Sequence, residues 1–422
     1  MFVNFESWTN GRRVASLGTN AGAPVLPFQK WRHFKEAFAP EIVEQAIMSS
    51  PFPVTSCLDP FGGSGTTALA CQFLGVRPVT MEVNPYLADL IEAKLTSYDV
   101  PSLITTLGNL LRSIDTFEAA TDRPMASLPP TFVEPGVADR WIFDAPVARR
   151  LLAFRLAIES LPAFAARRLF TALLGGIMIG VSNAVVNGKG RRYRRGWDAR
   201  RRDGADVDTA FAEAATAAIT EIDKFARRRE PGYEIVRGDC RSALGSREPC
   251  DIAIFSPPYP NSFDYTDVYN IELWMLGYLA DAGDNRRLRQ STVSSHVQVD
   301  RAFAAAPAGS ALLDTTMAAL EAVRPKLWNR RIPEMVGSYF DDMAGVIGEI
   351  GAALAPQGTI WMVVGDSRYA DIPVPVAEIL AELAPTLDLE VDRIDVLRDM
   401  RASAQQGGQR QLAESLVVLR RQ

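Results

Sequence analysis

Cysteine and histidine are scarce in this chain of 422 residues, which holds four cysteines and two histidines. The cysteines are scattered without a CxxC pair, so we do not expect a disulfide scaffold. We expect a reduced, cytoplasmic protein. Two histidines are too few for the usual histidine-rich zinc or iron sites, and we expect no metal. His33 and His296 are expected in a pocket or on the surface rather than as a catalytic pair.

Long apolar runs are also missing. No segment reaches the roughly 18 uninterrupted apolar residues that a membrane span needs. The longest candidate, 173–186, is broken by Ser182 and Asn183. The first residues lack a basic segment followed by an apolar run, so no signal peptide is expected. With 47% hydrophobic and 23% charged residues, the composition is that of a folded domain and excludes wholesale disorder.

Only six of the 45 basic residues are lysines, and the arginines are unevenly placed. The segment 189–202 carries eight positive charges, one negative charge and two aromatic rings, although the net charge of the chain is −5. One basic stripe on an acidic protein favours a polyanion as ligand, whereas a solvated surface loop is the alternative. The residues expected to contact nucleic acid are Lys189, Arg191, Arg192, Tyr193, Arg194 and Arg195.

Short apolar segments alternate with helical patterns, which predicts an α/β fold whose sheet is mostly parallel and covered on both faces. Seven strands are expected, the last two forming an antiparallel hairpin. The predicted strands are 54–58, 77–83, 233–238, 251–255, 359–364, 389–397 and 415–419. Helices are predicted over 66–74 and 85–95, and in the long Arg-rich part over 147–158, 165–186 and 208–229. This division predicts a catalytic domain made of 28–100 and 232–422, interrupted by a helical insertion over 101–231.

A glycine-rich turn follows the first predicted strand and opens a helix, with the sequence DPFGGSGT over 59–66. A phosphate loop needs a lysine after its last glycine, and Thr66 stands there instead. The dinucleotide pattern GxGxxA is only weakly matched. Glu82 ends the second strand 23 residues after Asp59, where a carboxylate accepts hydrogen bonds from both hydroxyls of a ribose. The arrangement favours an S-adenosylmethionine site.

A second motif, Ser256-Pro257-Pro258-Tyr259, follows the buried strand 251–255. Two successive prolines make a rigid, extended corner without amide donors. The corner therefore offers carbonyl oxygens and the Ser256 hydroxyl, while Tyr259 offers a ring. Such a set can hold an exocyclic NH₂ group on a flat heterocycle while the tyrosine stacks on the ring.

Together, DPFGGSGT and SPPY resemble the exocyclic-amino DNA methyltransferases, which methylate cytosine N4 or adenine N6. The resemblance covers about 28–95 and 233–421 and does not extend into the insertion. It implies the S-adenosylmethionine-dependent methyltransferase fold, a duplex DNA substrate with a flipped base, and a possible cognate restriction or defence protein. The Ser form of the tetrapeptide is associated with cytosine N4. The order of the two motifs is similar to an arrangement commoner among adenine enzymes, so adenine N6 stays open.

The resemblance also implies roles for individual positions. The catalytic residues would be Ser256, Pro257, Pro258 and Tyr259, and the base pocket would include Asn261, Asp264 and Tyr265. The cofactor would be held by His33, Phe34, Asp59, Pro60, Phe61, Gly62, Gly63, Ser64, Gly65, Thr66, Glu82 and Asp239, with Asp239 facing the adenine amino group. The Arg-rich insertion would take the place of the target-recognition region.

Other functions compete with this interpretation. RNA guanine-N2 methyltransferases have a similar glycine loop but an Asp or Asn form of the corner, and usually an additional N-terminal RNA-binding domain. A DNA-binding protein with an inactive methyltransferase fold is the non-enzymatic alternative. Pro249-Cys250 superficially matches the nucleophile of cytosine-C5 enzymes. Because it precedes the fourth strand, it is expected at the opposite edge of the sheet from the site.

Overall fold

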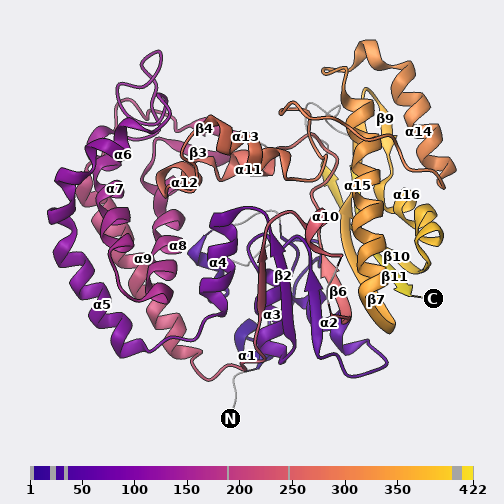
Figure 1. Ribbon diagram of the computed structural model, residues 1–422, viewed down its shortest axis with the longest axis horizontal. Coiled ribbons are helices and arrows are strands. Elements are labelled where there is room, and N and C mark those ends of the chain that lie inside the picture. The colour runs from indigo at the N-terminus through magenta and orange to yellow at the C-terminus, as the bar shows by residue number, and fades with distance from the viewer. Residues whose placement is uncertain are drawn as a thin grey trace.

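A seven-stranded sheet forms the centre of the computed structural model (Figure 1), which describes residues 4–19, 25–32, 37–187, 190–245, 248–401 and 411–421. The strand order is β10-β11-β7-β6-β1-β2-β5. The strands are β1 (Ser56–Asp59), β2 (Arg77–Glu82), β5 (Glu234–Arg237), β6 (Cys250–Phe255), β7 (Leu354–Gly365), β10 (Leu389–Arg401) and β11 (Gln411–Arg421). Five are parallel, and β11 runs antiparallel to both β7 and β10. The predicted sheet with its C-terminal antiparallel hairpin is confirmed.

Both faces of the sheet are covered, because its strands alternate their side chains between two apolar cores. On β6, Ile252 and Ile254 enter one core, whereas Ala253 and Phe255 enter the other. The first core is closed by α2 (Glu41–Met48), α3 (Thr66–Leu74) and α4 (Pro85–Leu95). The second is closed mainly by α14 (Ala311–Ala322), α15 (Ile332–Ala353) and α16 (Val376–Leu383).

The helices α3 and α4 begin and end where the sequence predicts. Asn84 caps α4 with its side-chain oxygen, which accepts from the backbone N–H groups of Tyr86 and Leu87, and Pro85 occupies the first turn. Gly75 ends α3 in the left-handed conformation (φ 80°), which glycine adopts without strain. Shorter elements complete this part: α1 (Phe5–Thr9), η2 (Gln29–Trp31), α10 (Cys240–Ala243), α11 (Tyr265–Val268), α12 (Asn270–Met275), α13 (Ala282–Gln290), η4 (Arg324–Lys326), β8 (Ser367–Tyr369), β9 (Ile372–Val374) and η5 (Ala384–Leu387).

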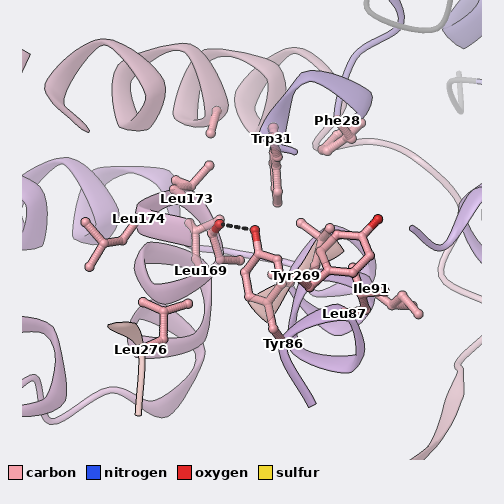
Figure 2. Close-up of a cluster of buried hydrophobic side chains, with 14 of the residues drawn as sticks. Phe28, Trp31, Tyr86, Leu87, Ile91, Leu169, Leu173, Leu174, Tyr269 and Leu276 are labelled. Carbon is pink, nitrogen blue, oxygen red and sulfur yellow. Dashed lines mark hydrogen bonds between the residues drawn. The ribbon is translucent and has the colours of Figure 1, made fainter. Parts of the chain in front are cut away.

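The segment between α4 and β5 forms a helical lobe at the left of Figure 1. It contains α5 (Val100–Ser113), η3 (Ile114–Ala120), α6 (Asp122–Ala126), α7 (Ala145–Glu159), α8 (Phe164–Val181), β3 (Ala184–Asn187), β4 (Gly190–Tyr193) and α9 (Gly204–Lys224). By length and composition alone, α8 could cross a membrane, but 56% of it is buried inside the protein. It packs on α4, where the Tyr86 hydroxyl donates to the Ala172 carbonyl at 3.2 Å (Figure 2).

Two predicted helices of the insertion are too long. The helix predicted over 208–229 ends at Lys224, and the second concerns α8. The pattern predicts a helix over 165–186, but α8 ends at Val181 and the chain turns into the β3–β4 hairpin. The β-branched pair Val185-Val186 suits a strand, and the helix end is held by a side chain from outside it. The Arg194 guanidinium donates to the carbonyls of Ile179 at 2.6 Å and Ser182 at 3.0 Å. The hydrophobic periodicity of the helix does not reveal such a cap, because Arg194 lies beyond the end of the helix.

Candidate active site

The glycine loop joins the carboxyl end of β1 to the start of α3. Gly63 and Gly65 have φ of 52° and 79°, in the left-handed region that favours glycine. Asp59, the last residue of β1, accepts a hydrogen bond from the Phe61 N–H at 2.9 Å, which turns the chain sharply after the strand. The loop is therefore bent back over the edge of the sheet where ligands of parallel α/β folds bind.

Glu82 lies beside this loop at the end of β2, and its side chain is only 8% exposed. One carboxylate oxygen accepts from the Gly63 N–H and the other from the Asn84 N–H, each at 2.7 Å. A carboxylate oxygen has a second acceptor site, so both oxygens can still receive a hydroxyl proton. The two contacts fix the orientation of the carboxylate.

Asp59 and Glu82 are two buried carboxylates close together. Burial raises the pKa of each to about 7, and the charge of Asp59 adds to the rise at Glu82. Within the described residues neither forms an ion pair. Burying two ionised carboxylates without a cation is unfavourable. A positively charged ligand would offset this penalty, because it stabilises the ionised form of both groups.

Lys94 supports the glycine loop, and the sequence interpretation missed it. It lies on α4, is 1% exposed, and donates through Nζ to the Ser64 carbonyl of the glycine loop at 2.8 Å. Burial lowers its pKa to about 7. A signal was present, because Lys94 follows Leu87, Leu90 and Ile91 at helical spacing and so occupies an apolar stripe.

The Pro-Pro corner is tied to β7. The Ser256 hydroxyl donates its single proton to the Val363 carbonyl at 2.9 Å, which leaves its oxygen as an acceptor. The Tyr259 hydroxyl donates to Glu414 Oε1 at 3.0 Å. Burial, and then the nearby charge of Glu414, raises the pKa of Tyr259 well above its usual value. Tyr259 is thus a neutral, anchored ring.

A single cavity of about 360 Å³ brings the two motifs together. The residues of the sequence prediction that line it are Asp59, Pro60, Phe61, Gly62, Gly63, Ser64, Thr66, Glu82, Asp239, Ser256, Pro257, Pro258, Tyr259, Asn261 and Tyr265. The two motifs are far apart in the chain. They meet because β6, which ends at the Pro-Pro corner, pairs with β1, which ends at the glycine loop. The cavity walls include further residues that no motif revealed, among them Arg398, Met400 and Glu414 from the C-terminal hairpin.

Three predicted site residues need correction or qualification. Asp264 does not line the cavity; it caps α11, and its carboxylate is occupied by Thr266 and by Arg289 Nε at 2.6 Å. Asp239 lines the cavity but also pairs with Arg241 at 2.7 Å, and Arg241 in turn binds Asp342. Gly65 shapes the loop without lining the cavity. His33 and Phe34 lie outside the described residues.

His296 and Cys250 are both buried, and only His296 lies at the cavity. His296 is buried at the cavity wall, where its Nδ1 accepts from the Gln298 N–H at 3.3 Å, and burial lowers its pKa to about 4. Cys250 begins β6, at the opposite end of that strand from the Pro-Pro corner, and burial raises its pKa to about 12. All four cysteines are buried and free.

The basic segment is used in two different ways. Arg192 and Arg195 are exposed and have no ion pair within the described part of the chain. Arg191 instead pairs with Asp267 of α11 at 3.1 Å, and Arg194 is consumed in capping α8. Arg194 therefore has a structural role, and its contact with nucleic acid stays a prediction. Tyr193 packs its ring 5.0 Å from that of Trp197, and Lys189 lies outside the described residues.

A seven-stranded, mostly parallel sheet with an antiparallel last strand, and a cavity at the carboxyl ends of β1, β2 and β6, define a methyltransferase fold. No protein-family model matches the chain. It is 28% identical to the Type II methyltransferase M.AvaI of Nostoc sp., over 94% of this chain and 85% of that protein. It is 23% identical to M.BsoBI of Geobacillus stearothermophilus, over 95% and 86%. These relatives confirm the resemblance to the exocyclic-amino DNA methyltransferases, and the cofactor is S-adenosyl-L-methionine.

Among solved structures, the chain aligns with TrmN from Thermus thermophilus at a TM-score of 0.33 and 10% identity. That alignment covers 94% of this chain and 52% of TrmN.

The cavity suits this cofactor. Glu82 offers two oriented acceptor oxygens for a ribose diol, and the glycine loop lets the backbone approach a ligand closely. The sulfonium and ammonium charges of the cofactor match the two buried carboxylates that no cation of the described chain neutralises. The sequence prediction of the cofactor is confirmed.

Proposed function

We propose that this chain is a site-specific DNA methyltransferase that transfers a methyl group to the exocyclic amine of a flipped base, cytosine N4. The similarity to Type II methyltransferases along nearly the whole chain supports DNA methylation and a role in restriction and modification. The observation that carries the proposal is that the Pro-Pro corner and the glycine loop line one cavity. The hydrogen-bond acceptors of the Pro-Pro corner and the cofactor-binding residues of the glycine loop would then face each other across this cavity.

The chemistry follows from what the corner offers. An exocyclic amine is a poor nucleophile because its lone pair is delocalised into the ring. Ser256 Oγ, with its proton committed to Val363, and the Pro257 carbonyl would accept the two N–H protons. This would localise the lone pair on nitrogen and orient it, which can supply several kcal/mol of barrier reduction. The bound cofactor supplies an electrophilic methyl group, so the protein needs no covalent nucleophile.

Cytosine is proposed as the target because the corner begins with Ser256 rather than with Asp or Asn. A base paired in a duplex must first be flipped out, which costs a few kcal/mol. Stacking on Tyr259 and phosphate contacts would offset that cost. Asn261 and Tyr265, which line the cavity just past the corner, are proposed to surround the flipped base.

The division of labour along the chain is part of the proposal. Segments 28–100 and 232–422 would form the catalytic domain, and 101–231 would recognise the target. Arg192 and Arg195 are the proposed phosphate contacts, since they are exposed and unpaired within the described residues. Because the proposed substrate is DNA, the proposed location is the cytoplasm, at the nucleoid. A cognate restriction or defence protein is the proposed partner.

The test is to express the protein in a host that lacks such modification and to sequence its DNA for modified bases. We expect N4-methylcytosine at one recurring sequence, and no modification with the Tyr259→Ala variant. N6-methyladenine at one sequence would correct the base but keep the function. Unmodified DNA, together with methylated RNA or with no product at all, would overturn the proposal.

The Tyr259→Ala variant separates the two halves of the site, because the ring faces the base and not the cofactor. Calorimetry should show cofactor affinity within about twofold of the wild-type value, while transfer to a duplex is lost. If this variant transfers methyl groups at the wild-type rate, the Pro-Pro corner does not take part in the reaction.

A further inference from the structure

The C-terminal hairpin forms a wall of the cavity next to the Pro-Pro corner. Arg398 and Met400 on β10 and Glu414 on β11 all line it. The register of β10 against β11 shifts between Val396 and Arg398, so the hairpin carries a bulge there. Bulges often lie beside active sites, where they redirect the side chains that follow. Here the bulge is followed by Arg398, which stands directly opposite Glu414.

Glu414 is a buried carboxylate with a defined set of partners. Its side chain is 3% exposed, and Oε1 accepts the Tyr259 hydroxyl proton at 3.0 Å. Arg398 donates to both carboxylate oxygens, to Oε1 at 3.2 Å and to Oε2 through Nε. Gly18 packs over the carboxylate so closely that a Cβ at that position would meet Oε2. The arginine compensates the buried charge, which leaves Glu414 a strong acceptor for the phenol.

The ring of Tyr259 is confined on another side by the backbone of β7. A Cβ built at Gly365 would lie 2.5 Å from the ring, so only glycine leaves room for it. Gly365 is the register partner of Glu414 across the β7–β11 ladder. The same pair of strands therefore supplies the surface on which the ring rests and the carboxylate that holds its hydroxyl.

We propose that Glu414, held by Arg398, is a positioning residue for methyl transfer, because it fixes the plane of the Tyr259 ring on which the target base stacks. The proposal rests on the proposed function and deepens it. Without the carboxylate, the ring would keep its apolar contacts but lose the bond that sets its rotation and its tilt. The base would still bind, but its amine would be less often aligned with Ser256 and Pro257.

A double-mutant cycle on transfer to a duplex tests the proposal, using Glu414→Leu, Glu414→Gln, Tyr259→Phe and the Glu414→Leu/Tyr259→Phe pair. We expect Glu414→Leu to lower kcat by roughly tenfold, the range of a hydrogen bond to a charged group. KM for DNA and cofactor affinity should change by less than about threefold. Glu414→Gln should recover most of the rate, since its amide oxygen still accepts. In the Tyr259→Phe background, Glu414→Leu should add little, because the bond is already gone.

The control is Asp392→Leu, which removes a carboxylate of the same hairpin that pairs with Arg393 and Arg420 away from the cavity. It should leave kcat unchanged, and the melting temperature of every variant reports its folding. Additive effects of Glu414→Leu and Tyr259→Phe, or an unchanged kcat for Glu414→Leu, would overturn the positioning role while the wild-type enzyme still methylates DNA. A wild-type enzyme that methylates no DNA would overturn the proposed function, and this role with it.

Discussion

The Glu82 carboxylate accepts a hydrogen bond from the Gly63 N–H at 2.7 Å, so the acidic residue that ends β2 holds the glycine loop that follows β1. The same carboxylate thus shapes the loop and, in the proposed site, would also bind the ribose diol. This relationship makes the site depend on the pairing of β1 with β2, which brings the two segments side by side.

Glu82→Gln should weaken S-adenosylmethionine binding by at least tenfold. An amide has only one acceptor oxygen, whereas the carboxylate must serve two backbone N–H groups and two ribose hydroxyls. Calorimetry measures the affinity. Glu234→Gln is the matched control, because Glu234 lies half-exposed on the neighbouring strand and pairs with Arg77. Equal affinity of Glu82→Gln and the wild-type protein would remove Glu82 from the cofactor site.

Cofactor affinity should rise with pH through about 7. Burial raises the pKa of Asp59 and of Glu82 to about 7, so both are largely protonated at pH 6 and ionised at pH 8. Only the ionised forms attract a cationic ligand, and for one coupled proton the affinity should grow by roughly tenfold between pH 6 and pH 8. Lys94, whose pKa burial lowers to about 7, loses its positive charge over the same range and acts in the same direction.

Calorimetry at pH 6, 7 and 8 checks this dependence, and proton release on binding can be read from buffers of different ionisation enthalpy. The slope should be shallower for Glu82→Gln, which has one titrating carboxylate fewer. An affinity that stays flat or falls between pH 6 and pH 8 would contradict the assignment of the two carboxylates to the site.

Arg192→Ala and Arg195→Ala should each lower the slope of log affinity against log salt by about 0.9 for duplex DNA, the value for one phosphate contact. Both should weaken binding to all sequences alike, since phosphate contacts carry no base information. Arg194→Ala should leave that slope unchanged and lower the melting temperature instead, because it uncaps α8. Binding measured at several salt concentrations separates the three. If none of the three substitutions changes the slope, DNA does not contact this basic segment.

Two glycines of α8 should respond in opposite directions to alanine. A Cβ at Gly176 would fall on the backbone carbonyl of Trp31, so Gly176→Ala forces the backbone apart and should cost about 1–3 kcal/mol or more. Gly180 has open space around its Cβ position, and Gly180→Ala should stabilise by about 0.5–1 kcal/mol through helix propensity. Thermal unfolding of both variants checks this, and equal shifts would contradict the close contact of α8 with the segment around Trp31.

Local patterns in the sequence were enough to predict the sheet, the helices α3 and α4, and both site motifs. Strand and helix periods are short-range properties. DPFGGSGT, Glu82 and SPPY each lie at the carboxyl end of a buried strand, the edge at which ligands of parallel sheets bind. The hairpin β10–β11 was also predicted, but only as an element of the fold.

The tertiary structure alone decided which side chains serve the site and which serve the scaffold. Lys94 and Glu414 reach the motifs from 30 and 155 residues away in the chain, and Arg398 holds Glu414. Arg194 and Asp264 looked like ligand-binding residues and are instead occupied by a helix end and by Arg289. Whether a charged side chain is free for a ligand depends on the groups packed around it, and those are set by contacts that no local period encodes.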